Sequence, residues 1–541
     1  MSQEAVASAE SRSRWIWVGA VLVLALGLRL LFLVGMTGSD DLHYATFARQ
    51  VAAGSFHPST YFQSLRLGII LPTALGYRLF GVSTATTVWF PVLMSLTGIL
   101  VVYLLTRELF GEHSATYAAV LYALLPIDVI QSGLLLPDIA VATLCGLALF
   151  CLLAAERTEM RRNSAFLFTT AGLLLGWAYL CKESAALGAG ILVLYALLTR
   201  RRFLHVGLLA AAFAAVLVGE GIYYSSETGD FLFRLHQVRS INWAQEDGAL
   251  TTQLVSAMEY PRAMFLSSEE FGLFWYLLIA ATIWALAARV RKAWVVALWV
   301  VPLGLYLQFG VTSVRPLGFI AHVPRYLTMV TIPAAALIGA FLASFRHRFR
   351  GLLLAFVFAG VVLASLFCMG LHYALTESRP HNSRSVAREL AELPRHPTYV
   401  VTHRGLIEHL AGYGNYDLRD LYQRNPQTHD YVVAQPIEAL RGSYVVVDYG
   451  LVSFERERWQ LKFPEYLERV PHSWIKRAEI HEDFSGLRYL PLRLVRWTLE
   501  RDLLPGPIAG KFRRTLNRIM ENRDCVIYEV PASIAPSGER P

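Results

Sequence analysis

Two adjacent carboxylates, Asp40 and Asp41, follow the first long apolar stretch of the chain, residues 15–34. A Gly-Ser pair precedes them, and serine is a favourable N-cap, so a helix is expected to begin at the two acids. A third acid, Asp138, is almost the only charge in the turn LLLPDIA, where Pro137 restricts the backbone. Carboxylates at helix ends often serve only solubility. These three, however, are candidate catalytic groups, because a positioned carboxylate can accept a proton from a hydroxyl.

Several cations lie at the same ends of the predicted spans as these acids. Most other basic residues of the spanning region lie at the opposite ends of the spans. The cations at the same ends as the acids are Arg66 in FQSLRLGII, Lys182 in LCKESA, Arg234 and Arg239 in FLFRLHQVRS, and Arg325 in HVPRYL. Guanidinium groups bind phosphate through two parallel hydrogen bonds and lysine supplies a point charge, so the set predicts a phosphate cradle. The alternative for each cation is snorkelling to water or pairing with Glu183, Glu227 or Asp230. The candidate substrate-binding residues beside them are His43, Tyr44, Glu183 and Tyr326.

The elements that must position these groups are membrane helices. Of the 541 residues, 55% are hydrophobic and 17% charged, a balance too apolar for a soluble protein of this length. About eleven apolar windows are long enough to cross a bilayer as helices. The predicted spans are approximately 15–34, 86–105, 115–131, 138–155, 165–181, 185–199, 204–223, 271–288, 293–311, 326–344 and 351–372. The first lacks a cleavage site and is expected to remain as an anchor.

Basic residues set the expected orientation of these spans. They precede the first span and then occupy every second turn, at 157–162, 200–202, 289–292 and 346–350. The positive-inside rule puts these turns in the cytoplasm, so the net charge of +8 indicates topology and not nucleic-acid binding. An odd number of spans leaves the carboxyl end outside. The segments predicted to lie on the outer face are then residues 35–85, the turns at Pro137 and Lys182, and residues 224–270 and 312–325. The five cysteines, four of them in or at the ends of apolar spans, imply no disulfide framework.

Two further parts are expected outside the spans. Segment 35–85 is expected to form two helices that lie on or dip into the outer leaflet. Residues 373–541 are expected to form a soluble α/β domain, with a helix in SRSVARELAEL and strands in TYVVTHRG and SYVVVDYG. Its stretch LRYLPLRLVRWTLERDLL suits a helix resting on lipid headgroups, or equally one packed on its own domain. The stretch YGNYDLRDLYQRNPQTHDY carries no motif with a nameable chemistry.

Five stretches, in order across residues 15–345, carry a family resemblance. SDDLHYATFARQVAAG with SLRLGIILPTALGYRLFGVS resembles the first outer loop of the GT-C glycosyltransferases, specifically glycosyltransferase family 39. That family includes the protein O-mannosyltransferases and the lipid A aminoarabinose transferases. The similarity continues in LLLPDIAVATLCGLALF, GLLLGWAYLCKESAALGAGILVLYALL, YYSSETGDFLFRL and HVPRYLTMVTIPAAALIGA. The resemblance implies a polytopic GT-C enzyme of the bacterial plasma membrane that uses a polyprenyl-phosphate sugar donor on the non-cytoplasmic side.

The resemblance also carries roles onto individual residues. The family's acidic pair matches Asp40 and Asp41, the acid of its second outer loop matches Asp138, and its lysine after the fifth span matches Lys182. Two departures concern the acceptor side. The second acid is usually glutamate and is Asp41 here, and the frequent Arg-Pro-Pro of the re-entrant segment appears only as Arg66-Leu67-Gly68.

The expected reaction needs one base and a set of cations. Asp40 is expected to take the proton of the acceptor hydroxyl, while Lys182 with Arg66, Arg234 or Arg325 stabilises the departing phosphate. Displacement without a protein nucleophile predicts inversion at the sugar. Asp41 or Asp138 would orient the acceptor or the sugar. No cofactor is required. A divalent metal, Mg²⁺ or Mn²⁺, is an alternative, with Asp40, Asp138 and His43 or His322 as ligands.

Two other functions compete with transfer. A transporter or lipid flippase would use the acids as proton relays, but it would place coupling charges near the bilayer midplane and show similar halves. A membrane scaffold presenting the outer domain would leave the paired acids and the cations without a role. The expected partners are therefore the lipid-linked donor, membrane lipids and a glycan, lipid or protein acceptor, with no nucleic acid.

Overall fold

The chain forms two compact units in the computed structural model. The first comprises Met1–Leu33 and His43–His372, and the second comprises Val34–Leu42 and Tyr373–Pro541. The short segment Val34–Leu42 thus clusters with the carboxyl-terminal part of the chain. The structure describes residues 3–37, 40–158, 160–199, 203–240, 259–266, 269–314, 317–319, 322–345, 351–393, 400–401, 440–450, 452, 465–480, 484–521 and 525–532.

The first unit is a bundle of apolar helices. Six of the described helices are long and apolar enough to cross a membrane: α4 (Thr84–Phe110), α7 (Asp138–Arg157), α8 (Arg161–Cys181), α10 (Phe203–Thr228), η2–α16 (Pro324–Ser344) and the Ala355–Glu377 part of α17 (Gly351–Glu392). Shorter apolar helices accompany them: α1 (Gln3–Leu31) over Trp15–Leu31, α3 (Leu67–Phe80), α9 (Ala185–Leu198), α14 (Phe274–Ala287) and α15 (Ala293–Phe309). The chain is an integral membrane protein, and the polytopic helical class is confirmed, while the number of spans stays a prediction.

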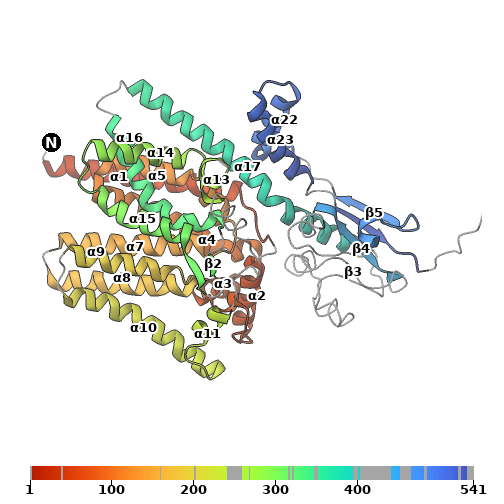
Figure 1. Ribbon diagram of the computed structural model, residues 1–541, viewed down its shortest axis with the longest axis horizontal. Helices are drawn as coiled ribbons and strands as arrows, with labels where there is room; N and C mark the ends of the chain where they lie inside the picture. The colour runs from red at the N-terminus through yellow and green to blue at the C-terminus, as the bar shows by residue number, and fades with distance from the viewer. Residues whose placement is uncertain are drawn as a thin grey trace, which may run out of the picture. The chain divides into compact units, whose positions relative to one another are not determined.

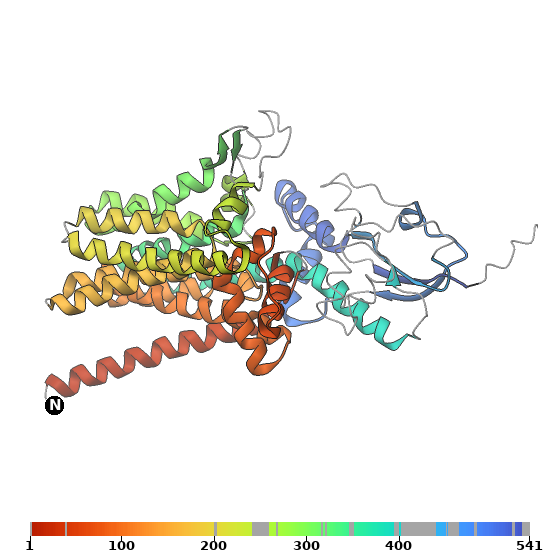
Figure 2. The same ribbon diagram turned by 90° about the horizontal axis from the view of Figure 1, so that it is seen from below.

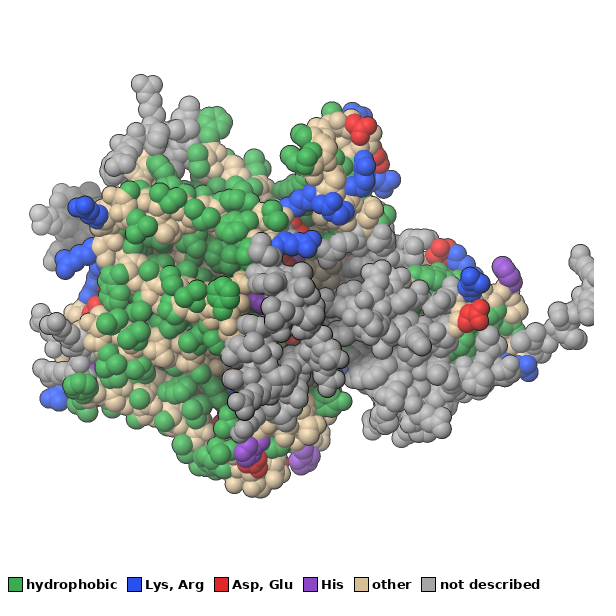
Figure 3. All heavy atoms as spheres, in the orientation of Figure 1, with side chains coloured by type: hydrophobic (Ala, Val, Ile, Leu, Met, Phe, Trp, Pro, Cys, Tyr) green, Lys and Arg blue, Asp and Glu red, His purple; other side chains and the backbone are tan. Residues whose placement is uncertain are grey.

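Helix packing brings distant segments of the sequence together. Helix α8 packs between α7 and α10, and α16 packs against α4, α5 (Glu112–Ala123) and α7. Figures 1 and 2 show these helices running side by side along one direction. Hydrophobic side chains cover most of the visible flank of the bundle in Figure 3, as lipid contact requires.

One predicted span is broken in the structure. Residues 115–131 were expected to form one helix, but α5 ends at Ala123 and α6 (Pro126–Ser132) continues at a bend of 56°. Pro126 has no backbone N–H and disfavours helical geometry in the residue before it, which explains the break. The guanidinium of Arg29 donates to the carbonyl of Ala123 at 3.3 Å and to the hydroxyl of Ser95 at 2.6 Å, and it also pairs with Asp128. This buried cation therefore satisfies the carbonyl of Ala123, which the break leaves at the end of α5.

Replacing Arg29 is expected to destabilise the bundle. Arg29→Met would leave Asp128 buried without its cation, which should lower the free energy of unfolding by about 3–5 kcal/mol. The double variant Arg29→Met/Asp128→Leu should recover most of that loss, because it removes both buried charges. Thermal unfolding in detergent measures both variants. Equal stability of the native chain and Arg29→Met would contradict a structural role for the pair.

Between α1 and α4 lies a run of short elements. These are α2 (Asp40–Ala53), the turn η1 (Phe62–Leu65) and α3. Their bounds agree with the two short helices expected in 35–85. The remaining short elements of the bundle are α11 (Phe233–Ser240), α13 (Glu259–Phe265), η2 (Pro324–Leu327) and the paired strands β1 (Val311–Val314) and β2 (Leu317–Phe319).

The second unit contains a small sheet. Its strand order is β3 (Val400–Val401), β4 (Tyr444–Asp448), β6 (Cys525–Glu529) and β5 (Ile475–Ile480), with β3 parallel to β4 and the other pairs antiparallel. Successive residues of β4 face opposite sides: Tyr444 and Val446 pack with Val386 and Leu390 of α17, whereas Val445 and Val447 pack with other apolar side chains. Short helices complete the unit: α21 (Glu465–Glu468), η5 (Leu487–Tyr489), α22 (Leu490–Glu500) and α23 (Gly506–Glu521).

Sequence and structure agree on these elements, with one extension. The expected strand SYVVVDYG is β4, and of TYVVTHRG the structure describes the two residues of β3. The expected span 351–372 and the expected helix 383–393 form a single helix, α17. The stretch from Tyr413 to Tyr431 lies outside the described residues.

Candidate functional site

A network of charged side chains occupies one end of the helical bundle, with Lys182 and Asp138 at its centre. Asp138 begins α7 and Lys182 follows the last residue of α8, so the antiparallel packing of these helices brings the two together. The ammonium of Lys182 donates to Oδ1 of Asp138 at 2.5 Å. Nε of Arg325, from the turn η2, lies 3.5 Å from Oδ2 of the same carboxylate. One buried acid is therefore shared by two cations.

Glu183 extends the network to a second pair of cations. Its carboxylate accepts a hydrogen bond from Arg234 at 2.8 Å and lies 3.8 Å from the guanidinium of Arg66. Arg234 also donates to Glu220 of α10 at 2.6 Å and to the carbonyl of Tyr179 at 2.9 Å. Among the described residues, the network thus contains four cations, Lys182, Arg325, Arg66 and Arg234, and three carboxylates, Asp138, Glu183 and Glu220.

Aromatic rings line the cations. The ammonium of Lys182 lies 3.3 Å from the ring centroid of Tyr326, and Arg325 lies 5.8 Å from the same ring. Arg66 donates to the hydroxyl of Tyr44 at 2.5 Å and lies 5.0 Å from the ring of Phe62. Rings at these distances favour a cation without neutralising its charge, so the cations keep their capacity to attract an anion.

Close packing fixes the loop that carries Arg66. Trp177 of α8 donates to the carbonyl of Gly68 at 3.0 Å, and Tyr224 of α10 donates to the carbonyl of Leu65 at 3.2 Å. A Cβ at Gly68 would lie 2.6 Å from the backbone nitrogen of Cys181, so only glycine allows this approach. Gly68 thus lets this segment contact the end of α8.

The arginines hold Glu183 in its charged form. Burial raises the pKa of this carboxyl, but the positive charges of Arg234 and Arg66 outweigh burial and lower the pKa to about 2. Burial lowers the pKa of Arg234, but the negative charges of Glu183 and Glu220 outweigh burial and raise this pKa above its ordinary value. Glu183 is therefore ionised throughout the neutral range and serves as an anion between two cations, not as a proton donor.

The lowered pKa predicts a pH-dependent contribution to stability. A carboxyl with a lowered pKa stabilises the fold above its ordinary pKa of 4.5, and this stabilisation disappears as the pH falls through about 2. We expect Glu183→Gln to lower the melting temperature by a constant amount from pH 8 to about 5. The difference should shrink below that pH. Thermal unfolding in detergent across this range checks the prediction, with Glu227→Gln as control because Glu227 pairs only with the exposed His57 among the contacts described. A constant difference down to pH 2 would contradict it.

The paired acids at the start of α2 differ in their surroundings. Asp41 is buried and accepts hydrogen bonds from the backbone N–H groups of Thr37 and Leu42 and from the hydroxyl of Thr37 at 3.1 Å. Asp40 is half-buried. His43, the next residue but one after Asp41, stacks on Tyr61 with ring centroids 5.8 Å apart. Asp41 thus fastens its own loop.

The structure therefore joins four of the five predicted cations with Asp138, Glu183, Tyr44 and Tyr326 in one network. Each cation of the network has a carboxylate partner. Of the expected partners, Glu183 pairs with Arg66 and Arg234, whereas Glu227 pairs with His57 and Asp230 with His236. The other partners are Asp138 and Glu220. Glu220 was missed by the sequence analysis. Its signal was a lone carboxylate inside the apolar run VLVGEGIYY, where an unpaired charge is costly. Arg239 belongs to α11, and its side chain lies outside the described part of the chain.

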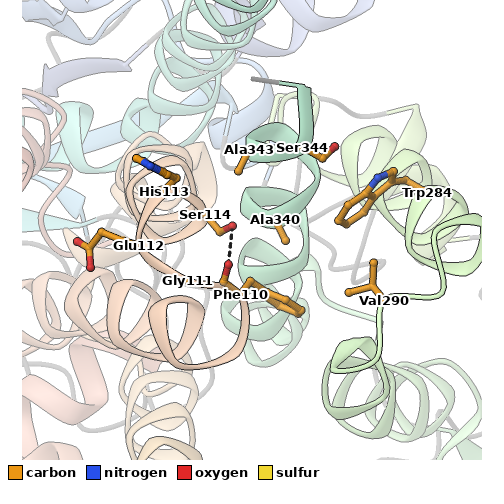
Figure 4. A pocket seen from close by; sticks show the side chains of 10 residues that line it. All are labelled: Phe110, Gly111, Glu112, His113, Ser114, Trp284, Val290, Ala340, Ala343 and Ser344. Atoms are coloured by element: carbon orange, nitrogen blue, oxygen red, sulfur yellow. Dashed lines mark hydrogen bonds between the residues drawn. The ribbon is translucent and has the colours of Figure 1, made fainter. Parts of the chain in front are cut away.

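A cavity of about 390 Å³ lies at the opposite end of the bundle (Figure 4). It is lined by the turn from Phe110 to Ser114 and by side chains of α14 and α16, among them Trp284 and Ser344. Helix α16 runs from the charged network to this cavity, a distance of about 25 Å for its 17 residues. The cavity is therefore separate from the charged network.

The candidate metal ligands do not form a metal site here. Within the described residues no three His, Cys, Asp or Glu side chains come together as a metal would require. The carboxylate of Asp138 already contacts Lys182 and Arg325, and His322 faces the carbonyl of Gln308 at 3.0 Å. These contacts occupy two of the candidate ligands in the described part of the chain.

The chain is similar in sequence and fold to known membrane enzymes. Residues 68–220 match the model of the dolichyl-phosphate-mannose-protein mannosyltransferase family. No curated protein sequence matches the chain. ArnT from Cupriavidus metallidurans in the apo state shares the fold with a TM-score of 0.57 at 17% identity, over 83% of this chain and 95% of that one. The same enzyme bound to undecaprenyl phosphate gives 0.54 at 18% identity, over 82% and 94%.

An archaeal enzyme has a related fold. The Archaeoglobus fulgidus oligosaccharyltransferase tethered with an acceptor peptide gives a TM-score of 0.50 at 14% identity, over 82% of this chain and 69% of that one. The matched segment 68–220 contains Asp138, Lys182, Glu183 and Glu220 of the charged network. The chain therefore shares its fold with these enzymes, and its segment 68–220 has the sequence pattern of the mannosyltransferase family.

Proposed function

We propose that the chain transfers a sugar from a polyprenyl-phosphate-linked donor to an acceptor hydroxyl at the outer face of a bacterial plasma membrane. The observation that carries the proposal is the network of Lys182, Arg66, Arg234 and Arg325 around three carboxylates. Four clustered cations favour the binding of an anion, and the fold is shared with an enzyme solved with undecaprenyl phosphate bound. A lipid-linked phosphate is the anion that apolar helices around such a network would admit.

The donor phosphate is assigned to the cations. Lys182 and Arg325 are held by Asp138, and Arg66 and Arg234 are held by Glu183, so each pair is positioned before the substrate arrives. Among the described residues, the buried Nε of Arg234 has no hydrogen-bond acceptor, so this guanidinium keeps unused hydrogen-bonding capacity. Fixed charges of this kind stabilise developing negative charge without reorganisation.

The proton acceptor is assigned to Asp40. It begins α2, and Tyr44, one helical turn later on the same face, is hydrogen-bonded to Arg66. The bond between the anomeric carbon and the phosphate oxygen breaks, and its electron pair stays on the polyprenyl phosphate. The acceptor oxygen bonds to the carbon from the opposite side and its proton passes to Asp40, so the sugar is transferred with inversion.

The remaining assignments concern the acceptor and the membrane. Asp138 orients Lys182, while His43, Tyr44, Glu183 and Tyr326 surround the donor sugar or its phosphate. Asp41 holds the loop that precedes α2. Residues 1–372 form the catalytic membrane domain, and residues 373–541 form an α/β domain outside the cytoplasm, where the positive-inside rule puts the carboxyl end. The acceptor is a glycan, lipid or protein, and nucleic acid is not a partner.

Transfer by the purified chain in lipid nanodiscs tests the proposal. The native protein is incubated with radiolabelled polyprenyl-phosphate sugars and a membrane extract, and label is followed into products that no longer carry the lipid. We expect release of polyprenyl phosphate in step with labelled product, whose anomeric configuration is opposite to that of the donor. Movement of intact donor across a liposome membrane without cleavage would instead indicate a flippase and would overturn the proposal.

A further inference from the structure

The helical hairpin formed by α22 and α23 carries an apolar stripe on its exposed surface. On α22 the side chains of Leu492, Val495 and Leu499 are buried and face the rest of the unit. Leu490, Leu494 and Trp497 lie on the opposite side of the helix, because they are spaced by four and three residues. These three side chains are between 42% and 45% exposed. The helix is therefore apolar on two opposite faces, and packing within the unit explains only one of them.

The stripe continues beyond α22. Leu503 in the connection and Ile508 in α23 are 57% and 47% exposed. Asp502 turns the chain between the two helices with a positive φ of 49°. The exposed apolar surface thus extends over both arms of the hairpin, which a folded domain in water would avoid.

Basic residues border this apolar surface. Between residues 487 and 520 the chain has eight arginines and lysines but only two acids, Glu500 and Asp502. Arg493 and Arg496 flank the stripe on α22, and Arg501 lies 4.7 Å from the ring of Trp497. Figure 3 shows lysine and arginine side chains next to hydrophobic ones on the projection that these helices form. An apolar stripe bordered by cations is the pattern of a helix that lies in the surface of an anionic membrane.

The attachment of the hairpin indicates the depth at which it lies. The turn η5 leads directly into α22, and the hydroxyl of its Tyr489 donates to Glu377 at 2.9 Å. Tyr489 also contacts Tyr373, with ring centroids 5.7 Å apart, and Arg488 lies 5.0 Å from the ring of Tyr373. Tyr373 and Glu377 form the final turn of the apolar stretch Ala355–Glu377, where α17 leaves the membrane.

The start of α22 is therefore fixed to the point where a membrane helix enters the headgroup region. From there Trp497 is only about 10 Å along the helix from Leu490. Tyrosine, tryptophan and arginine are the side chains that anchor proteins at this level of a bilayer. We propose that the hairpin α22–α23 lies on the membrane and inserts the side chains of Leu490, Leu494 and Trp497 among the acyl chains of anionic lipids.

Spin labels on the full-length chain test this proposal. The five native cysteines are buried, so a cysteine introduced at an exposed position can be labelled selectively. Leu494→Cys places a nitroxide on the stripe, and Glu500→Cys places one on the charged flank of the same helix. Ile475→Cys is the matched control, since Ile475 is an exposed apolar residue of β5 beside Lys476 and Arg477. Collisions with oxygen, which partitions into lipid, are compared with collisions with a water-soluble nickel chelate.

In nanodiscs that contain phosphatidylglycerol, we expect the ratio of oxygen to nickel accessibility to be several-fold higher at position 494 than at positions 500 and 475. The ratio at 494 should fall when phosphatidylcholine replaces the anionic lipid. Nickel accessibility at 494 equal to that at 475 would overturn the proposal, and an unchanged ratio in phosphatidylcholine would overturn the assignment of an anionic surface. Spectral broadening at 494 that disappears on dilution with unlabelled chain would identify a second copy as the occupant and also overturn it.

Discussion

Asp40→Asn is expected to lower the rate of sugar transfer by about 10²–10⁴-fold, the range that loss of a general base produces. The asparagine side chain keeps the size and hydrogen-bonding capacity of aspartate but cannot accept the proton of an acceptor hydroxyl. The turnover number should fall while the KM for the lipid donor stays close to the native value, because the donor phosphate is assigned to the cations of the charged network. Labelled product formed per minute by purified protein in nanodiscs is the measurement.

Asp41→Asn is the matched control for this substitution. Asp41 is buried, and its carboxylate accepts hydrogen bonds from two backbone N–H groups and from the hydroxyl of Thr37. We therefore expect its replacement to lower the melting temperature more than Asp40→Asn does, because Asp40 is only half-buried. Full transfer by Asp40→Asn would show that another group takes the proton, even if the native chain is a glycosyltransferase.

Lys182→Met is expected to lower the turnover number by about 10²–10³-fold, since it removes a fixed charge that faces the departing phosphate. Methionine preserves much of the apolar stem of lysine next to Tyr326. Lys182→Arg keeps the charge and should retain more activity than Lys182→Met. The measurement is again labelled product, together with the rate at which polyprenyl phosphate is released.

A double variant separates catalysis from charge balance. Lys182 pairs with Asp138 at 2.5 Å, so Lys182→Met alone also leaves a buried carboxylate with Arg325 as its remaining partner in the network. Lys182→Met/Asp138→Asn removes that imbalance and should restore the melting temperature. If Lys182 acts on the phosphate, transfer stays low in the double variant. Restored transfer would mean that Lys182 only neutralises Asp138.

Much of the fold could be predicted from the sequence. The apolar stretches later seen as α4, α7, α8, α10 and α16 were evident, because a helix in lipid must be both long and apolar to satisfy its backbone. The end of α17 was harder to predict. Residues after His372 turn polar, and hydropathy marks where a chain leaves the membrane but does not mark where a helix ends. The continuation of α17 to Glu392 therefore could not be read from composition.

The break in the expected span 115–131 is a second case. Pro126 was visible in the sequence, yet a proline inside an apolar stretch either kinks a helix or ends it. Which of these occurs depends on whether other groups satisfy the freed carbonyls. Arg29, almost a hundred residues earlier in the chain, donates to the carbonyl of Ala123, so the outcome depended on packing between distant helices.

The sequence by itself determined that this is a polytopic membrane protein, and its motifs indicated the GT-C class and the charged residues worth testing. Only the tertiary structure decided how those charges pair. Lys182 and Glu183 are neighbours in the sequence, yet one faces Asp138 and the other faces Arg66 and Arg234. Charges attract over a few ångströms in a low-dielectric interior, and sequence spacing does not determine which helix ends come that close. The partners were therefore fixed by helix packing, through contacts such as Gly68 against Cys181.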